Sequence, residues 1–220
     1  MNNRSVNTNP IPWKQIKDTS LKIASLNCMN LSNNYEHIIC DNTLMESSIL
    51  TLCETWLDNR TYLKIDGYRA HFNSVGPGKG IAVYLKNDTF TPTVNINEKK
   101  MQLTKLESEN LDIIIVYRSE QGNTTELLSH IITMLREETA TVICGDFNIC
   151  YKTNKKNKIS KFLETNGFKQ HVEEPTHLKG RQIDHFYFKP SLMYSADPSI
   201  HRYTPYYSDH DAICATLRSI

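Results

Sequence analysis

The chain has 220 residues, with 25 Lys and Arg against 24 Asp and Glu, and its net charge is +1. At 39% hydrophobic residues it can bury one substantial core, which leaves little room for a second domain. The chain is not cationic overall. To bind a polyanion such as a nucleic acid, it would have to concentrate its positive charge in one region. The sequence has no apolar run long enough to predict a membrane span, and the opening residues are too polar for a signal peptide.

Strands and helices alternate in the predicted structure after a polar tail over residues 1–20. Apolar alternation predicts a strand over 21–28, and a helix is predicted over 35–47. The nearly continuous apolar run 49–55 predicts an interior strand that ends at a carboxylate, Glu54. Further strands are predicted over 81–85 and 111–117.

The second half continues this alternation within one domain that spans 21–220. Helical spacing of apolar residues predicts a helix over 124–138, N-capped by Thr124 or Thr125, and a short helix over 159–164 closed by Asn166-Gly167. Strands are predicted over 141–144, 182–188 and 211–217, with an ordered loop over 190–207. The pattern favours an α/β fold of two packed sheets flanked by helices.

The six cysteines include no C-x-x-C pair, and most lie within apolar runs. Such cysteines usually behave as small buried apolar side chains. They predict reduced thiols in an intracellular protein, and no Cys or His group has the spacing of zinc ligands.

Two short polar motifs stand at the ends of predicted strands. Gly145-Asp146-Phe147-Asn148 follows an apolar strand, and Ser208-Asp209-His210 precedes another. Carboxylate, amide and imidazole groups in these positions would supply oxygen ligands for a hard cation, a base for water and a donor for phosphoryl oxygens. The pattern therefore indicates a metal-assisted phosphoester hydrolase, although Gly-Asp-x-Asn is also common in simple turns.

Six segments occur in the order found in the endonuclease/exonuclease/phosphatase superfamily, which the chain resembles from residue 21 to residue 217. They are Ser25-Leu26-Asn27, Leu52-Cys53-Glu54-Thr55, Val116-Tyr117-Arg118, Gly145-Asp146-Phe147-Asn148, Gln182-Ile183-Asp184-His185 and Ser208-Asp209-His210. The resemblance implies a four-layer α/β/β/α sandwich of two packed mixed sheets. It is greatest to the apurinic-like endonucleases of LINE-type retrotransposons, and similar domains occur in other mobile elements, including some Helitrons.

The resemblance implies a role for each motif residue. Asp146 would be the base for the attacking water, and Asn148 would bind the phosphate or fix Asp146. His210 would donate to a non-bridging phosphate oxygen, with Asp184 orienting its ring. Tyr117 would reach the phosphate through its hydroxyl, or serve only as a core aromatic. His185 and Asp211 are expected to point away from the site, because neighbouring strand residues face opposite sides.

A divalent metal site is also implied by the resemblance. Glu54 would be the main carboxylate ligand of Mg²⁺, for which Mn²⁺ could substitute, and Asn27 would be a neutral oxygen ligand or would position water. Asp209 would lie near both the metal and the attacking water.

Candidate DNA contacts lie outside this group. Lys152, Lys155, Lys156, Lys158 and Lys161 form the densest positive segment, which would follow a phosphate backbone or simply be a solvated loop. Thr176 and Arg181 are further candidates for the DNA backbone. Only six residues separate Thr176 from Ile183, so the long DNA-reading hairpin of some relatives is shortened here.

The motifs together predict a Mg²⁺-dependent DNA endonuclease that leaves a 3′-hydroxyl and a 5′-phosphate on one strand. Its partners would be double-stranded DNA in the nucleus and a reverse transcriptase domain of the same polyprotein, and the domain would be monomeric. One alternative is another phosphoesterase of this fold, such as an apurinic repair endonuclease, a phosphoinositide phosphatase, a sphingomyelinase or a deadenylase. Another is a non-catalytic nucleic-acid-binding derivative.

Overall fold

The computed structural model describes residues 20–58, 60–74, 76–154 and 157–219, so the predicted tail lies outside the described residues except for Ser20. The strands of this part are β1 (Leu21–Asn27), β2 (Ile49–Cys53), β3 (Arg69–Asn73), β4 (Ile81–Leu85), β5 (Thr91–Glu98), β6 (Met101–Glu107), β7 (Leu111–Arg118), β8 (Ala140–Asp146), β9 (Lys169–Gln170), β10 (Asp184–Lys189), β11 (Ser199–Tyr203) and β12 (Ala212–Leu217). Its helices are α1 (Leu31–Ile39), α2 (Asn42–Met45), α3 (Thr124–Met134) and α4 (Lys158–Thr165). None of these described helices has the length and apolar character needed to cross a bilayer.

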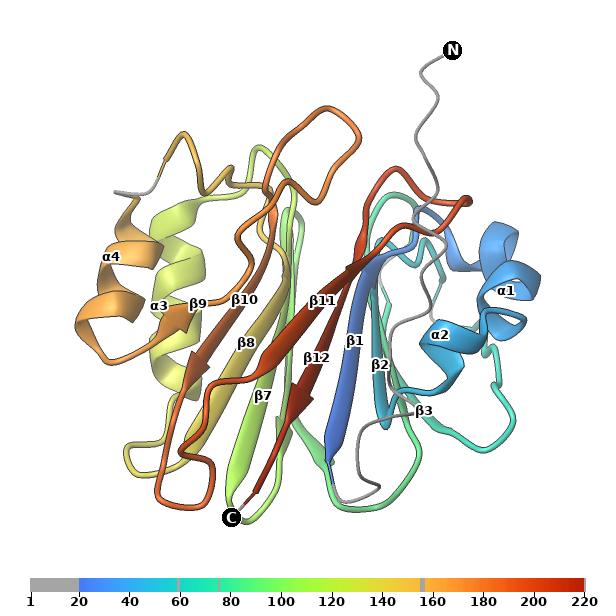
Figure 1. Cartoon of the computed structure of the whole chain (residues 1–220). Coiled ribbons are helices and arrows are strands. Elements are labelled where there is room, and N and C mark those ends of the chain that lie inside the picture. Colours follow the sequence, from blue (N-terminus) through green and yellow to red (C-terminus); the bar gives the residue numbers. More distant parts are fainter. Residues whose placement is uncertain (1–19, 59, 75, 155–156, 220) are drawn as a thin grey trace.

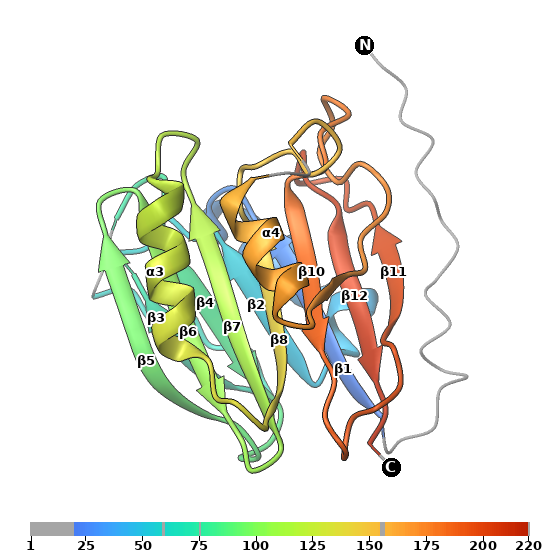
Figure 2. The same ribbon diagram turned by 90° about the vertical axis from the view of Figure 1, so that its left-hand side faces the viewer.

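Two six-stranded sheets pack face to face (Figure 1). One has the order β11-β12-β1-β2-β4-β3, and the other has the order β5-β6-β7-β8-β10-β9. The pairs β1–β2 and β7–β8 are parallel, while the remaining pairs are antiparallel. Helices α1 and α2 cover the outer face of the first sheet, and α3 and α4 cover that of the second, as Figure 2 also shows. The predicted four-layer sandwich of mixed sheets is confirmed.

Strand β7 shows how the sequence builds these layers. Ile113 and Ile115 belong to the core between the sheets, whereas Ile114 and Val116 belong to the apolar layer that packs against α3 and α4. All four side chains are fully buried. A strand covered on both faces must be apolar throughout, which explains the continuous apolar run in this part of the sequence.

The helix predicted over 35–47 is wrong in its bounds, because two helices occupy this region. The Asn30 side chain accepts a hydrogen bond from the Asn33 N–H, so α1 begins four residues before the predicted start. The Asp41 side chain accepts from the N–H groups of Thr43 and Leu44, and it thereby begins α2.

The predicted caps of α3 also need correction. Asn123, rather than Thr124 or Thr125, is the N-cap residue, and its side chain accepts from the N–H groups of Thr125 and Glu126. The helix ends at Met134, short of the predicted residue 138, because Leu135 is extended. The end of α4 is confirmed, with Asn166 as C-cap and a left-handed Gly167 at a φ of 83°.

The predicted loop over 190–207 contains strand β11, so this prediction is wrong in part. The strand pairs with β12 alone and forms one edge of its sheet. An edge strand exposes much of its surface, and the sequence Ser-Ile-His-Arg-Tyr therefore lacks a strong apolar signal.

Strand register brings the predicted site residues to one end of the sandwich. Asn27 ends β1 opposite Cys53, the residue before Glu54. Asp146 ends β8 and is aligned with Tyr117 on one side and with Asp184, the first residue of β10, on the other. Segment 208–210 enters β12 at the same end, because β12 runs antiparallel to β1.

Gly145 is required where β8 approaches β7. A Cβ at this position would lie 2.1 Å from the Val116 carbonyl oxygen, and the residue has a φ of +127°. Because only glycine fits both conditions, it lets Asp146 follow directly at the end of a fully buried strand.

Candidate active site

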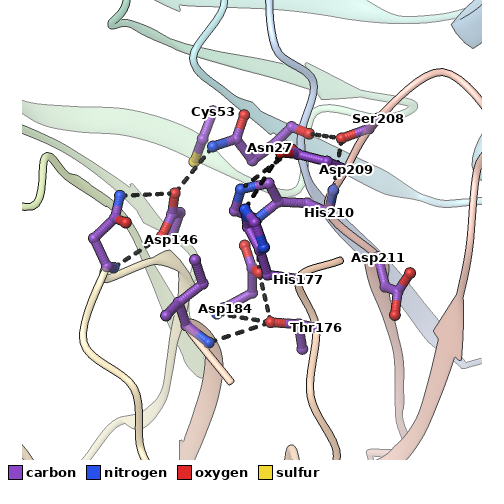
Figure 3. Close-up of polar contacts among 12 residues, drawn as sticks. Asn27, Cys53, Asp146, Thr176, His177, Asp184, Ser208, Asp209, His210 and Asp211 are labelled. Atoms are coloured by element: carbon purple, nitrogen blue, oxygen red, sulfur yellow. Dashed lines mark hydrogen bonds and ion pairs between the residues drawn. The ribbon is translucent and has the colours of Figure 1, made fainter. Parts of the chain in front are cut away.

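Asp146 is the most enclosed charged group of the candidate active site, at 1% exposure. The Asn27 side-chain amide donates to its Oδ2 at 2.9 Å (Figure 3). Asn148 donates its backbone N–H to Oδ1 at 2.8 Å and its side-chain amide to Oδ2 at 3.2 Å. Burial, and then the neighbouring carboxylate of Asp184, raise the pKa of Asp146 to about 7.

His210 and Asp184 form a buried pair that faces Asp146. His210 Nδ1 lies 2.9 Å from Asp184 Oδ2, and the Thr176 hydroxyl donates to the same oxygen at 2.6 Å. Ligand atoms of Asp146, Asp184 and His210 lie within 4.8 Å of one another. Burial alone would lower the pKa of His210, but Asp184 and then Asp146 and Asp209 outweigh it and raise that pKa to about 9. The ring is therefore positively charged near neutral pH.

Asp209 is more exposed than this pair and contacts a second histidine. Its Oδ2 lies 3.3 Å from His177 Nε2, while its Oδ1 lies 3.8 Å from His210 Nε2. Figure 3 places both rings beside Asp209. Burial, and then the charge on His210, lower the pKa of His177. His177 directly follows Thr176 in the chain, but sequence reasoning assigned it no role.

Glu54 lies directly after β2 in a left-handed conformation, at a φ of 53°. The Tyr117 hydroxyl is within hydrogen-bond distance of Glu54 Oε1, at 3.1 Å, and of the Gly78 carbonyl, at 3.0 Å. Burial, and then the Glu54 charge, raise the pKa of Tyr117 well above its usual value, so the phenol stays protonated. Tyr117 thus contacts the predicted metal ligand.

Strained backbone gathers at this end of the molecule. Among the described residues, the non-glycine residues with positive φ are Met29, Asn30, Glu54, Trp56 and Asn148. They all lie in loops that follow β1, β2 and β8, where the site residues stand. Such conformations typically cost about 1–3 kcal/mol each and cluster at functional sites. The strain supports a functional interpretation of these loops.

A cavity of about 320 Å³ opens between these groups. Its lining residues are Met29, Glu54, Tyr117, Ser119, Glu120, Asn148, His177, Lys179, Arg181, Ile183, Asp209 and His210. Asn27 and Asp146 are not among the described residues that line it, and Asn27 Oδ1 accepts from the Met29 N–H. Asn27 therefore belongs with Asp146, because the Asn27 side-chain amide holds the Asp146 carboxylate in place.

The cavity residues fit a hard divalent cation. Glu54 and Asp209 both present carboxylates to it, and Glu54 forms no ion pair with any described cationic side chain. The closely spaced groups Asp146–Asp184–His210 and His177–Asp209–His210 offer further ligand atoms, and Glu54 is in neither group. Asp184 holds His210 Nδ1, so this ring nitrogen is not available as a ligand. Oxygen ligands from Glu54 and Asp209 are the chemistry that Mg²⁺ prefers.

Arg118 braces the loop after β8, a role that sequence reasoning missed. The side chain is 4% exposed, and it donates to the carbonyl oxygens of Phe147 at 2.7 Å and Asn148 at 2.9 Å. It also donates to the Gly122 carbonyl at 2.6 Å. The only signal was its place in the Val-Tyr-Arg motif, since the loops it joins are distant in sequence.

The predicted DNA contacts have mixed outcomes. Thr176 is wrong as a backbone contact, because it is fully buried and its hydroxyl instead accepts from the Ile183 and Asp184 N–H groups while donating to Asp184. Arg181 lines the cavity and pairs with Glu120 at 2.6 Å. Lys155 and Lys156 lie outside the described residues, whereas Lys152, Lys158 and Lys161 are exposed.

His185 and Asp211 point away from the cavity, as predicted. His185 stacks on Phe147 and its Nε2 lies 2.8 Å from the Ile149 carbonyl, while burial lowers its pKa to about 4. Asp211 pairs with Arg202 at 3.1 Å, and Figure 3 shows its carboxylate apart from the group formed by Asp184, His177 and His210. Both side chains are structural.

Known proteins share this fold. Residues 111–214 match the model of a family described as endonuclease-reverse transcriptase. An AP endonuclease from Archaeoglobus fulgidus superposes with a TM-score of 0.69 at 17% identity, covering 90% of this chain and 99% of that one. The endonuclease domain of TRAS1, a telomere-specific non-LTR retrotransposon, gives 0.65 at 12% identity, covering 90% and 98%.

A third solved structure, D. rerio TDP2 humanized by 14 mutations, gives a TM-score of 0.65 at 15% identity and covers 91% of this chain and 100% of that one. No curated protein sequence matches the chain. The family match and the shared fold confirm the resemblance predicted from the six motifs. The chain thus has the fold of these proteins, and its residues 111–214 match the endonuclease-reverse transcriptase family.

Proposed function

We propose that this chain is a Mg²⁺-dependent DNA endonuclease that cleaves one strand by attack of water and leaves a 3′-hydroxyl and a 5′-phosphate. One observation carries the proposal: Asp146 and the His210–Asp184 pair converge within 4.8 Å, with pKa values displaced to about 7 and about 9. A carboxylate able to accept a proton and an imidazolium able to donate are the pair that phosphoester hydrolysis requires.

Asp146 is the proposed base. Three neutral N–H donors, from Asn27 and Asn148, hold its two oxygens in one orientation. Neutral partners suit this position, because a second carboxylate in place of Asn148 would repel the phosphate. Asp146 takes a proton from water as the bond between the water oxygen and phosphorus forms.

His210 is the proposed donor to the phosphate. Asp184 holds Nδ1, so Nε2 is the nitrogen available to a non-bridging oxygen as negative charge builds there. The phosphorus–O3′ bond breaks, and the 3′-oxygen takes a proton from solvent. This bond cleavage gives the 3′-hydroxyl and 5′-phosphate ends.

Glu54 and Asp209 are the proposed ligands of Mg²⁺. With the ion bound, the cavity gains positive charge against the phosphoryl oxygens. The protonated Tyr117 hydroxyl orients the Glu54 carboxylate and stands at the cavity wall, where a phosphate oxygen can accept from it. Because the phenol has one proton, Tyr117 is proposed to support Glu54 in the free protein and to donate to a phosphate oxygen when substrate is bound.

The DNA substrate and the mobile-element setting extend the proposal. The matched family is described as endonuclease-reverse transcriptase, and one similar structure is a retrotransposon endonuclease domain. The 3′-hydroxyl would then prime reverse transcription by a further domain of the same polyprotein. Exposed Lys152, Lys158 and Lys161 follow the Asp146 motif and would hold the DNA backbone.

A non-catalytic binding domain is the competing interpretation. Such a domain has no need for an enclosed base or for a second carboxylate behind a histidine. Here Glu54, Asp209 and His210 line one cavity, and Asp146 and Asp184 have ligand atoms within 4.8 Å of His210. Their convergence favours catalysis over binding alone.

Nicking of supercoiled plasmid tests the proposal. We expect open-circular product with Mg²⁺ and none with excess chelator, and DNA polymerase should extend the nicks without prior end treatment. Nicking that persists in chelator would contradict the metal requirement. If plasmid stays intact while a phosphoinositide or a 3′-phosphorylated oligonucleotide is hydrolysed, the chain is a different phosphoesterase of this fold.

A further inference from the structure

His177 is joined to the Ser208–Asp211 segment by backbone as well as by its side chain. The Asp211 N–H donates to the Thr176 carbonyl at 2.6 Å, and the Leu178 N–H donates to the Asp209 carbonyl at 2.8 Å. His177 and His210 form a β-bridge between these two hydrogen bonds. The loop that carries His177 is thereby fixed against the segment that carries the candidate catalytic histidine.

The proton on the His177 ring has a defined position. The Lys179 backbone N–H donates to His177 Nδ1 at 3.0 Å, so Nδ1 carries a lone pair and the proton is on Nε2. Nε2 lies 3.3 Å from Asp209 Oδ2, within reach of a hydrogen bond. His177 can therefore donate to Asp209 through Nε2.

Asp209 lies between the two histidines, but it is within hydrogen-bond distance of His177 alone. Its Oδ1 is 3.8 Å from His210 Nε2, too far for a hydrogen bond. The two rings meet edge to face with centroids 4.7 Å apart, so a small rotation of the Asp209 side chain would bring it onto His210. His210 Nε2 stays available to the cavity while His177 holds Asp209.

We propose that His177 is a positioning residue whose Nε2–H holds the Asp209 carboxylate away from His210, leaving His210 Nε2 free to donate to the substrate phosphate. This inference rests on the proposed function of His210. Without the His177 donor, Asp209 would turn, and its 3.8 Å ion pair with His210 would shorten to a direct hydrogen bond. The donor would then be occupied, and turnover would suffer more than substrate binding.

Two substitutions at His177 separate donation from packing. His177→Phe keeps a ring and removes the donor, whereas His177→Gln retains an N–H donor at a similar distance from the backbone. We expect His177→Phe to lower kcat by about 10- to 100-fold, the usual scale for losing a partner that orients a site ligand, with a smaller change in KM. His177→Gln should restore most of the loss.

His130→Phe is the matched control. It removes another histidine–carboxylate pair, between His130 Nε2 and Glu98 Oε1 at 2.7 Å, on α3 and β5. We expect this variant to nick DNA as the wild type does. Equal losses in His177→Phe and His177→Gln, or an unchanged kcat in His177→Phe, would overturn the proposal.

Side-chain ¹⁵N NMR of the metal-free protein gives a readout independent of activity. We expect His177 to carry its proton on Nε2, and we expect the His210 Nε2–H resonance to shift in His177→Phe but not in His177→Gln. A proton on His177 Nδ1, or a His210 Nε2–H resonance that is unchanged in both variants, would overturn the positioning role. If the wild type shows this tautomer and shift pattern but does not nick DNA, the proposed function fails while the contact with Asp209 stands.

Discussion

The two walls of the candidate active site are built differently. Asp146, Asp184 and His210 are between 1% and 5% exposed and are held by short hydrogen bonds, to two asparagines around Asp146 and to a threonine beside Asp184. Glu54 and Asp209 are partly exposed, and each is held by one neutral side chain, Tyr117 and His177. The buried wall suits proton transfer, whereas the open wall suits a cation and a substrate that come from solvent.

Enclosure explains the displaced pKa values on the buried wall. A carboxylate in water would be too weak a base to accept a proton at pH 7, but burial raises the pKa of Asp146 and makes it a stronger base. The same enclosure strengthens the attraction between His210 and Asp184. Loss of a buried residue should therefore cost more than loss of an open one.

The largest effect is expected on the buried wall. Asp146→Asn or His210→Ala should each lower the nicking rate by roughly 100-fold or more, because each removes a proton acceptor or a donor to developing charge. Asp88→Asn, at an exposed aspartate in the loop after β4, is the matched control. Thermal unfolding must show both site variants folded. Near-wild-type nicking by either folded variant would contradict the assigned chemistry.

A smaller and different effect is expected on the open wall. Glu54→Gln should weaken the apparent Mg²⁺ affinity by about 10- to 100-fold, because it removes one of two carboxylate charges at the proposed metal site. DNA affinity, measured without metal, should change little. Glu120→Gln removes a charge from the same cavity but leaves Glu54 in place, and it should keep the wild-type Mg²⁺ titration. If Glu54→Gln gave the same Mg²⁺ titration as Glu120→Gln, the Mg²⁺ ion would not bind at Glu54.

The pH profile should report the buried wall alone. Asp146 must be ionised to accept a proton, so the rate should fall about tenfold per pH unit as pH drops below about 7. His210 must be protonated to donate, so the rate should fall as pH rises above about 9. Single-turnover nicking between pH 5 and pH 10 measures both limbs. A flat profile would remove Asp146 and His210 from the chemical step.

The smallest effect is expected from surface lysines. Lys158→Ala with Lys161→Ala should weaken binding to all duplexes similarly and flatten the salt dependence by about 0.9 log units per lost phosphate contact. Lys169→Ala with Lys189→Ala is the matched control, because these lysines lie at the end of β9–β10 away from Asp184. An unchanged salt dependence would show that the Lys158–Lys161 segment does not contact DNA. A loss of affinity limited to one duplex would show that the segment recognises DNA sequence.

Sequence patterns predicted the interior of the fold better than its edges. Strands such as β2 and β7 are covered on both faces and are therefore apolar throughout. Strand β11, by contrast, has one neighbour and an exposed face, and its sequence predicts a loop. Strands β3, β5 and β9 are sheet edges too, and they gave no clear signal. The interior strand β6 was not predicted either, because Gln102, Thr104 and Lys105 interrupt its apolar residues although they are buried. The bounds of α1, α2 and α3 depend on single capping residues that propensity alone does not identify.

The candidate site divides in the same way. Motif order predicted the residues that stand at strand ends, including Asp146 and Asp184. It did not predict contacts between loops far apart in sequence, such as Arg118 with the Phe147 carbonyl or His177 with Asp209. The sequence predicts that Thr176 contacts DNA, but the residue is buried. Its burial depends on packing against Asp184, a contact that no local sequence pattern reveals.

The most direct test of the division between the two walls is to locate the metal. In crystals soaked with Mn²⁺, the anomalous signal should lie in the cavity beside Glu54 and Asp209. It should be lost in Glu54→Gln crystals and kept in Asp146→Asn crystals. A single strong peak among Asp146, Asp184 and His210 would contradict this division, because a cation there would exclude the proton-transfer roles of Asp146 and His210.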